Sequence, residues 1–181
     1  YNIIGTLATG FLTGFAPAAS YAYNAKLYKR VFQLLFQSQI VPMSIMIVLI
    51  IIVLAIPDKI QGIWVEDKSI LAYSHHIRPP FYTIIFIPVL AVLNNLLLAT
   101  GHSFLGVLPS AVNSVSKIVA IFILYYTNKD NPWALFYTFT ISDICSIITA
   151  FSCSLVPIKF MWKQLKENPG YEKSQINKSL L

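Results

Sequence analysis

The sequence predicts an all-α membrane protein, a bundle of five transmembrane helices. Hydrophobic residues make up 56% of the 181 residues and charged residues only 11%, whereas soluble domains carry about 25% charged residues. Five apolar stretches are each long enough to cross a bilayer core of roughly 30 Å at 1.5 Å per residue. None of them shows the alternation of a barrel strand, so all five are predicted to be helical.

The predicted spans form one transmembrane helical lobe over residues 1–158, and residues 159–181 form a cytoplasmic C-terminal tail. The spans cover residues 3–22, 38–57, 81–100, 104–126 and 133–158. The first span is not a secretory signal, because no basic leader precedes it and further spans follow. Since the chain begins at Tyr1 and not at a methionine, we expect it to be a piece of a longer protein.

The first span contains residues that weaken or bend a helix. Gly10 and Gly14 form a GxxxG pair, which lets another helix approach closely. Pro17 removes a backbone hydrogen bond and favours a bend. Two interpretations stay open: simple helix packing, or a hinge that bends or slides during a transport cycle.

The second span is the clearest, because no charged residue lies between Ile40 and Pro57. Residues 24–30, before this span, and residues 159–181, after the fifth span, together hold eight of the thirteen basic residues. The positive-inside rule places both segments in the cytoplasm. We therefore expect a multi-pass protein of the plasma (inner) membrane with a cytoplasmic C-terminus, with Trp64 and Trp133 at the outer interface and Trp162 at the inner one.

The third span carries two adjacent amides, Asn94 and Asn95, shortly before Gly101. Amides between membrane helices usually hydrogen-bond a neighbouring helix. Both asparagines are therefore candidates either for helix packing or for contact with a transported substrate.

The fourth and fifth spans each carry one ionisable residue deep in the hydrocarbon, Lys117 and Asp143. Counted at 1.5 Å per residue from Tyr126 and Trp133, both lie about 14 to 15 Å below the outer surface, so they are predicted to pair. Polar or small residues share a helix face with each of them, Ser110 and Asn113 with the lysine, and Ser146, Ala150 and Cys153 with the aspartate. The pair is interpreted either as a structural lock between two helices or as a charge site reached by substrate or protons.

Several other classes of site are excluded or disfavoured. The chain has no phosphate-binding glycine loop, no HExxH and no GxSxG motif, so it is not expected to be an enzyme. His75 and His76 lack partners at metal-ligand spacing, and no metal or other cofactor is expected. Cys145 and Cys153 are about 12 Å apart along one helix and cannot form a disulfide. The net charge of +6 is distributed by membrane side, so it indicates attraction to anionic lipids and not to nucleic acid.

The segment from Gly14 to Arg30 resembles the multidrug and toxic-compound extrusion (MATE) family. That family has a proline and a serine near the end of the second helix of each six-helix half, then a tyrosine-glycine-alanine turn and a basic residue. The matching residues here are Pro17, Ser20, Tyr23, Ala25 and Arg30. Asn24 stands where glycine is usual, and asparagine also tolerates a left-handed turn. Weaker likenesses follow at residues 64–70 and 94–102.

The resemblance implies one lobe of a twelve-helix transporter, most simply helices eight to twelve in the second half. Such a protein exports organic, often cationic, compounds in exchange for protons or sodium. The implied partners are the lipid bilayer, a small organic substrate and the remaining half of the transporter. The family couples transport through acidic residues within its helices, and Asp143 is the acidic residue inside a span of this chain.

Two alternatives remain open at this stage. A related flippase for lipid-linked oligosaccharides would need several cationic residues in its cavity, whereas Lys117 is the basic residue within the spans. A non-transporter multipass protein, such as a membrane enzyme or a channel subunit, is the other.

Overall fold

The computed structural model describes residues 12–56, 79–129 and 131–167, together with residues 6, 10 and 59. Within these residues every regular element is helical, which confirms the prediction of an all-α membrane protein. The α-helices are α2 (Phe15–Asn24), α3 (Tyr28–Ala55), α6 (Pro79–Tyr82), α7 (Ile87–Ala99), α8 (Ser103–Thr127) and α9 (Tyr137–Glu167). Two 3-10 helices, η2 (Ile84–Phe86) and η3 (Pro132–Phe136), precede α7 and α9.

Four helical stretches in the described part of the chain are long and apolar enough to cross a membrane. They are Tyr28–Ala55, Pro79–Ala99, Ser103–Thr127 and Trp133–Glu167. The predicted first span lies partly outside the described residues, and its described part overlaps the ten-residue α2, which continues two residues past the predicted end.

Two helices extend beyond the spans predicted from hydropathy. Helix α3 begins at Tyr28, ten residues before the predicted span, and α9 continues through Glu167, past the predicted boundary at residue 158. The extension of α9 follows from packing, because Met161 is fully buried in the core that α9 shares with α2, α3 and α7. Hydropathy detects the part of a helix that lies in hydrocarbon and misses helical turns that continue beyond it.

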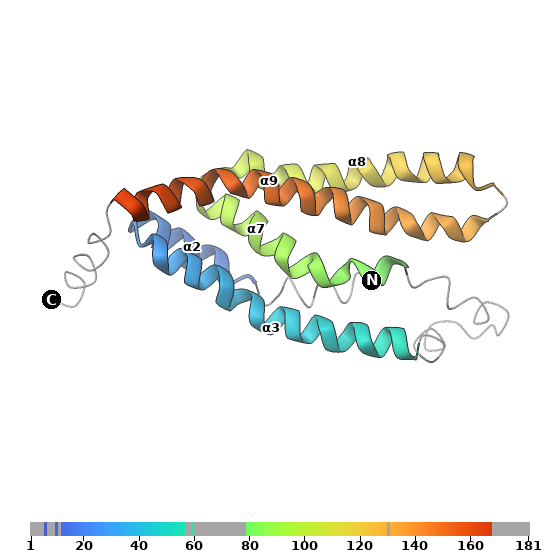
Figure 1. The fold of residues 1–181 in the computed structure, drawn as a ribbon, viewed down its shortest axis with the longest axis horizontal. Helices are drawn as coiled ribbons and strands as arrows, with labels where there is room; N and C mark the ends of the chain where they lie inside the picture. Colours follow the sequence, from blue (N-terminus) through green and yellow to red (C-terminus); the bar gives the residue numbers. More distant parts are fainter. Residues whose placement is uncertain are drawn as a thin grey trace.

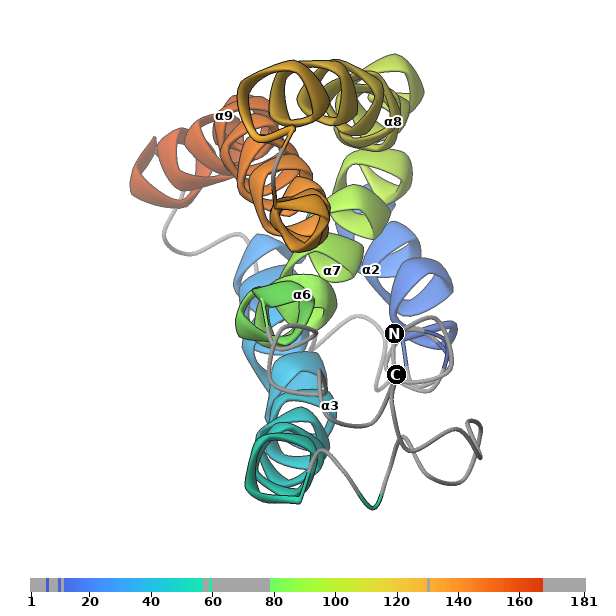
Figure 2. The ribbon, with the colours of Figure 1, turned by 90° about the vertical axis from the view of Figure 1, so that its right-hand side faces the viewer.

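Helix α7 occupies the centre of the bundle and contacts α2, α3, α8 and α9. Helices α8 and α9 lie side by side on one flank of α7, and α2 and α3 lie on the other (Figures 1 and 2). The main core forms where the α2–α3 turn meets the last turns of α9. Its buried residues are Leu12, Phe15, Ala19, Ala22, Val31, Val92, Leu96 and Met161.

The turn between α2 and α3 differs from the sequence-based expectation. Asn24 is the last residue of α2, and the left-handed residue is Lys26, with φ of 59°. The amides of Leu27 and Lys26 donate to the carbonyls of Ala22 and Tyr23, which is the Schellman pattern that ends many helices. A lysine therefore occupies the position that usually favours glycine.

Candidate functional site

A buried carboxylate joins three segments of the chain on one side of the bundle. The Thr83 hydroxyl donates to Oδ2 of Asp143 at 2.9 Å, and the Asn113 amide donates to Oδ1 at 3.1 Å. Thr83 lies between α6 and η2, Asn113 is on α8 and Asp143 is on α9. Asp143 is 6% exposed and Thr83 5% exposed. We call these three residues the Asp143 cluster.

Two further hydrogen bonds fix the helices on either side of this cluster. The Thr140 hydroxyl donates to the carbonyl of Pro79 at 2.8 Å, and the Ser146 hydroxyl donates to the carbonyl of Pro109 at 2.9 Å. Residues 140, 143 and 146 are three apart, so they follow one another along one side of α9. The buried positions of α9 include Asp143, Ser146 and Ala150, so these three members of the predicted small and polar stripe are buried.

The predicted ion pair between Lys117 and Asp143 does not form. The Lys117 ammonium lies over the ring of Phe139 instead, 5.5 Å from its centroid. Asp143 accepts from Asn113, which is one turn before Lys117 on α8. The observed pairing of α8 with α9 is therefore shifted by one helical turn from the predicted pairing.

The 3-10 segment η3 contributes to this shift. A 3-10 helix rises about 2.0 Å per residue and an α-helix 1.5 Å, so the five residues of η3 place Asp143 about 2.5 Å deeper than an α-helical start would. That is about half of one 5.4 Å helical turn.

Asn94 and Asn95 do not hydrogen-bond the Asp143 cluster. The Oδ1 atom of Asn94 is buried and has no hydrogen-bond partner among the described residues. Its backbone carbonyl lies beside Gly106 of α8, where an added Cβ would be 3.4 Å from that oxygen and 3.3 Å from the side chain of Leu98. Among the described glycines, Gly106 is therefore the one that permits a close approach of two helices, and the sequence analysis did not identify it.

The roles of Gly10, Gly14 and Pro17 in packing and bending stay predictions. A Cβ added at either glycine would meet no described atom within 4 Å. Pro17 is in the first turn of α2, where backbone amides have no partner within the helix and proline is tolerated. The prolines inside described helices are Pro42, Pro109 and Pro157, and all three are fully buried.

Thr83 is the member of the cluster that the sequence analysis missed. A single threonine in an apolar span has many uses, including a bond to its own helix backbone. The available signal was Pro79-Pro80 just before it, since prolines at a helix start favour an irregular first turn. The pair His75-His76 and Trp64 lie outside the described residues.

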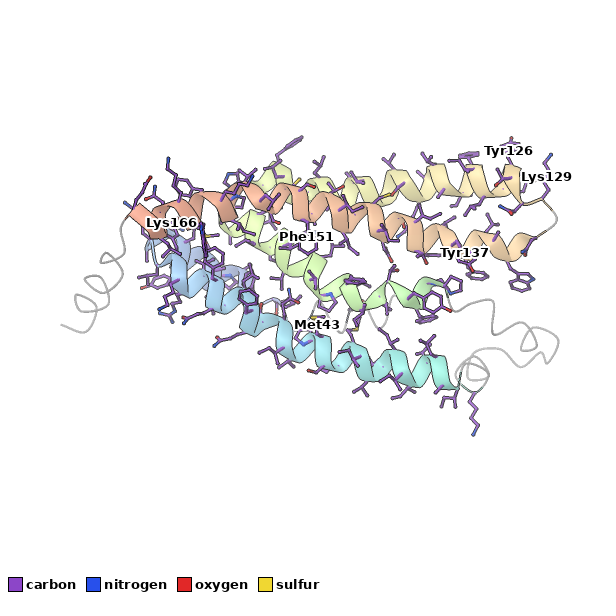
Figure 3. All side chains as sticks on the ribbon, in the orientation of Figure 1. Met43, Tyr126, Lys129, Tyr137, Phe151 and Lys166 are labelled. Atoms are coloured by element: carbon purple, nitrogen blue, oxygen red, sulfur yellow. The ribbon has the colours of Figure 1, made fainter. Side chains whose placement is uncertain are left out.

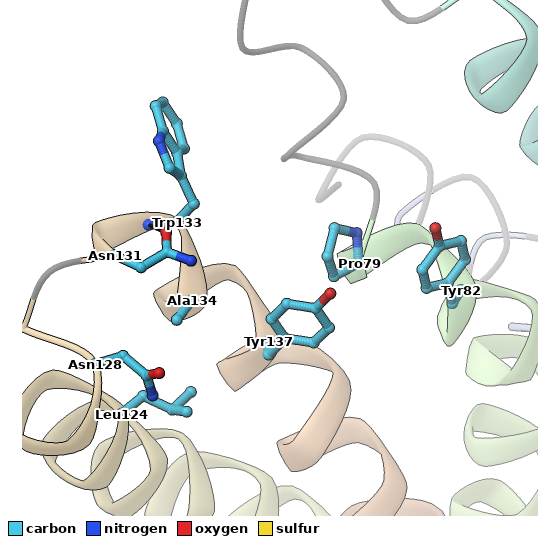
Figure 4. A pocket seen from close by; sticks show the side chains of 8 residues that line it. All are labelled: Pro79, Tyr82, Leu124, Asn128, Asn131, Trp133, Ala134 and Tyr137. Carbon is cyan, nitrogen blue, oxygen red and sulfur yellow. Dashed lines mark hydrogen bonds between the residues drawn. The ribbon is translucent and has the colours of Figure 1, made fainter.

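A hollow of about 410 Å³ lies at the end of the bundle where α8 and α9 are joined (Figure 4). Its lining is aromatic, amide and apolar: Pro79, Tyr82, Leu124, Asn128, Asn131, Trp133, Ala134 and Tyr137. Pro79 also accepts the hydrogen bond from Thr140, and Tyr82 directly precedes Thr83. The hollow is thus adjacent to the segment that contributes Thr83 to the Asp143 cluster.

A comparison with models of known protein families identifies the family of the chain. The MatE family model matches residues 1–125, more than half of its length. The chain belongs to the MatE family. Members of this family are transporters, so this MatE chain is a multi-pass membrane protein of a transporter family. No curated protein and no solved structure matches it. Thr83 and Asn113 lie within the matched region, and Asp143 lies beyond it.

Proposed function

We propose that this MatE chain supplies one lobe of a secondary active exporter, in which a proton or a sodium ion at Asp143 drives export of an organic, often cationic, compound. The observation that carries the proposal is the burial of Asp143 at the junction of α8, α9 and the segment before η2. Ionisable residues inside membrane helices are costly and mark ion or proton pathways.

The chemistry of the Asp143 cluster accommodates two charge states. An ionised carboxylate accepts from both Thr83 and Asn113, as observed. A protonated carboxyl group gains one O–H donor. Thr83 can then accept at the same place, because a hydroxyl both donates and accepts, whereas the Asn113 amide continues to donate to Oδ1. A proton on Oδ2 therefore reverses one hydrogen bond, and the Thr83 hydroxyl must then turn its own hydrogen to another acceptor.

Reversing or breaking these bonds acts on helix packing. Asp143 is tied to α8 through Asn113 and to the start of the α7 span through Thr83. A sodium ion would compete with both donors for the carboxylate oxygens. Either ion thus changes the contacts that hold three spans together, which is what alternating access requires.

The hollow in Figure 4 supports access to this site from one end of the bundle. We propose that its lining of aromatic rings and amides forms part of the route by which ions approach. By the positive-inside rule, this end faces outward in the plasma membrane and the C-terminus lies in the cytoplasm. The bilayer, a small organic substrate and the remaining half of the transporter complete the functional unit.

The test is transport of ethidium, an organic cation, by the full-length protein in proteoliposomes. Transport is measured with an imposed proton gradient, with an imposed sodium gradient and with neither. Asp143→Asn is expected to abolish gradient-driven transport. Ser152→Ala, an exposed position on the same helix, is the matched control and should transport normally. Equal transport with and without both gradients, or full activity of Asp143→Asn, would contradict the proposal.

The flippase alternative has less support from the described residues. Among them, Lys117 is the one lysine or arginine away from the ends of the helices, and its ammonium rests on Phe139. A pyrophosphate site needs several converging cations. Proteoliposomes containing a fluorescent lipid-linked oligosaccharide provide the comparison, and gradient-independent movement of that lipid would favour the flippase.

A further inference from the structure

One end of the molecule gathers six basic side chains from two segments that are distant in the sequence. We call it the basic end. Its members are Lys26, Lys29 and Arg30, at the α2–α3 turn and the start of α3, and Lys159, Lys163 and Lys166, in the last turns of α9. All six are exposed. Figure 1 shows these two segments meeting, and Figure 3 places Lys166 at the opposite end of the bundle from Lys129.

Aromatic contacts hold the two segments of the basic end together. The rings of Tyr28 and Phe160 are 6.3 Å apart, and so are those of Phe32 and Trp162, both in edge-on geometry. Met161 is fully buried between these contacts. Trp162 nevertheless remains 57% exposed. The basic end therefore combines fixed, partly exposed rings with six basic side chains.

The lysines of α9 share one face of the helix. Lys159, Lys163 and Lys166 are spaced i, i+4 and i+7, so they point to one side, and Met161 points toward the other, into the core. The Lys166 ammonium lies over the Trp162 ring, 5.9 Å from its centroid. Glu167 is the acidic residue of the described part of this helix end, and it pairs with Lys163 at 3.7 Å. The lysine face thus keeps a positive charge.

Apolar surface continues directly from this lysine face. Leu155 and Val156, one turn before Lys159, are about half exposed. They belong to a helix that is apolar enough to span a membrane. An occupant of this surface must therefore place an anionic group beside the lysines and an apolar chain along Leu155 and Val156. A phospholipid has both parts, whereas a nucleic acid has only the first.

We propose that the basic end is a binding surface for anionic phospholipids, with phosphates against the lysine face of α9 and Trp162 at the level of the headgroups. Basic side chains near a membrane surface attract anionic lipids, and tryptophan favours the interface. This interaction is independent of the proposed transport activity. It requires only that α9 crosses the bilayer.

Trp162 itself provides the reporter. In the full-length protein, the variant Trp64→Phe/Trp133→Phe leaves Trp162 as the tryptophan of this chain, and any tryptophan elsewhere is replaced in the same way. Vesicles contain phosphatidylcholine and phosphatidylglycerol, with bromine on the acyl chains of one lipid or the other. Bromine quenches nearby tryptophan, so the ratio of quenching by the two brominated lipids measures the local preference. A second variant that retains Trp133 and lacks Trp64 and Trp162 reports on the opposite end.

We expect Trp162 to be quenched preferentially by brominated phosphatidylglycerol and Trp133 to show no such preference. Each lysine near the surface contributes about fivefold in lipid affinity, so Lys159→Gln/Lys163→Gln/Lys166→Gln should lower the preference at Trp162 at least about fivefold. Lys129→Gln is the matched control and should leave it unchanged. If the triple variant does not fold, the three single variants carry the test, and each should lower the preference.

Three results would overturn the proposal. These are equal quenching of Trp162 by the two brominated lipids, an unchanged preference in the lysine variants, and an equal preference at Trp133. Inorganic phosphate and chloride are then compared at matched ionic strength. Loss of the preference in phosphate alone would identify a site for a soluble anion and contradict the lipid surface, whereas equal weakening by both salts is the expected screening.

Discussion

The hydrogen bond from Thr83 to Asp143 should contribute measurably to the stability of the bundle. Thr83→Val keeps the shape of the side chain and removes the donor. Both residues are at most 6% exposed, and the donor–acceptor distance is 2.9 Å, so water cannot replace the lost bond easily. We expect the variant to lower the free energy of unfolding.

The magnitude follows from the kind of acceptor. Hydrogen bonds between membrane helices average about 0.6 kcal/mol and reach about 1.7 kcal/mol, whereas bonds to charged groups in proteins contribute about 1.5 to 3 kcal/mol. A buried carboxylate belongs at the overlap of these ranges, so we expect about 1.5 kcal/mol. That value corresponds to roughly a tenfold larger unfolding equilibrium constant.

The assay is equilibrium unfolding of the full-length protein in mixed micelles, arranged as a double-mutant cycle with Asp143→Leu. In the Asp143→Leu background the carboxylate acceptor is absent, so Thr83→Val should lower the free energy of unfolding by less than about 0.5 kcal/mol. Ser152→Ala is the control, since it shares no partner with Asp143 and its effect should add to that of Asp143→Leu within the same limit. If the effects of Thr83→Val and Asp143→Leu also add, the bond does not stabilise the bundle and the reasoning is wrong.

Three further predictions concern helix packing and can be measured by the same unfolding assay. Gly106→Val should lower the free energy of unfolding by about 1 to 3 kcal/mol, because an added Cβ alone already lies 3.3 Å from the Leu98 side chain. Gly14→Ala is the control, because a Cβ added at Gly14 would meet no described atom within 4 Å. Equal effects of the two substitutions would refute the close approach at Gly106. Lys26→Gly should stabilise by about 1 kcal/mol, because glycine removes the cost of a left-handed side chain; a loss of stability would argue against that backbone geometry. Met161→Ala should lower the free energy of unfolding by about 2 to 5 kcal/mol, because it leaves a cavity between α9 and the α2–α3 turn. A negligible loss of stability would show that the end of α9 is not packed there.

The sequence identified much of the Asp143 cluster before any coordinates were considered. Asp143 and Asn113 stand out because polar side chains are rare and costly in hydrocarbon, so each requires a partner inside the protein. Thr83 did not stand out, since a threonine can satisfy its hydroxyl on its own helix, as Thr149 does on the carbonyl of Cys145. The partner of Asp143 on the α7 span depends on which helices are neighbours, and a single sequence does not encode that directly.

Lys117 contacts Phe139 and not the predicted partner Asp143 for a similar reason. Its depth was estimated on the assumption that the fifth span is α-helical from its first residue, and η3 lengthens that start. The extra rise is about 2.5 Å, roughly half of a helical turn, so it accounts for part of the shift. The sequence signal for such a turn, Asn131-Pro132 with the Asn131 side chain accepting from the Trp133 amide, is local and does not by itself give the length of the 3-10 segment.

By itself, the sequence determined that this is an all-α membrane protein, because hydropathy depends on composition along the chain and lipid requires helices. Its second to fifth predicted spans overlap the four long apolar helices of the described residues. It also determined the resemblance to the transporter family that the family match confirms. Only the tertiary structure decided that Asp143 is shared between Thr83 and Asn113, that Gly106 lies close to a neighbouring helix, and that α9 continues to Glu167. Each of these depends on side chains from different helices meeting at one depth, and that depth is set by small differences in helix rise and packing between segments far apart in the chain.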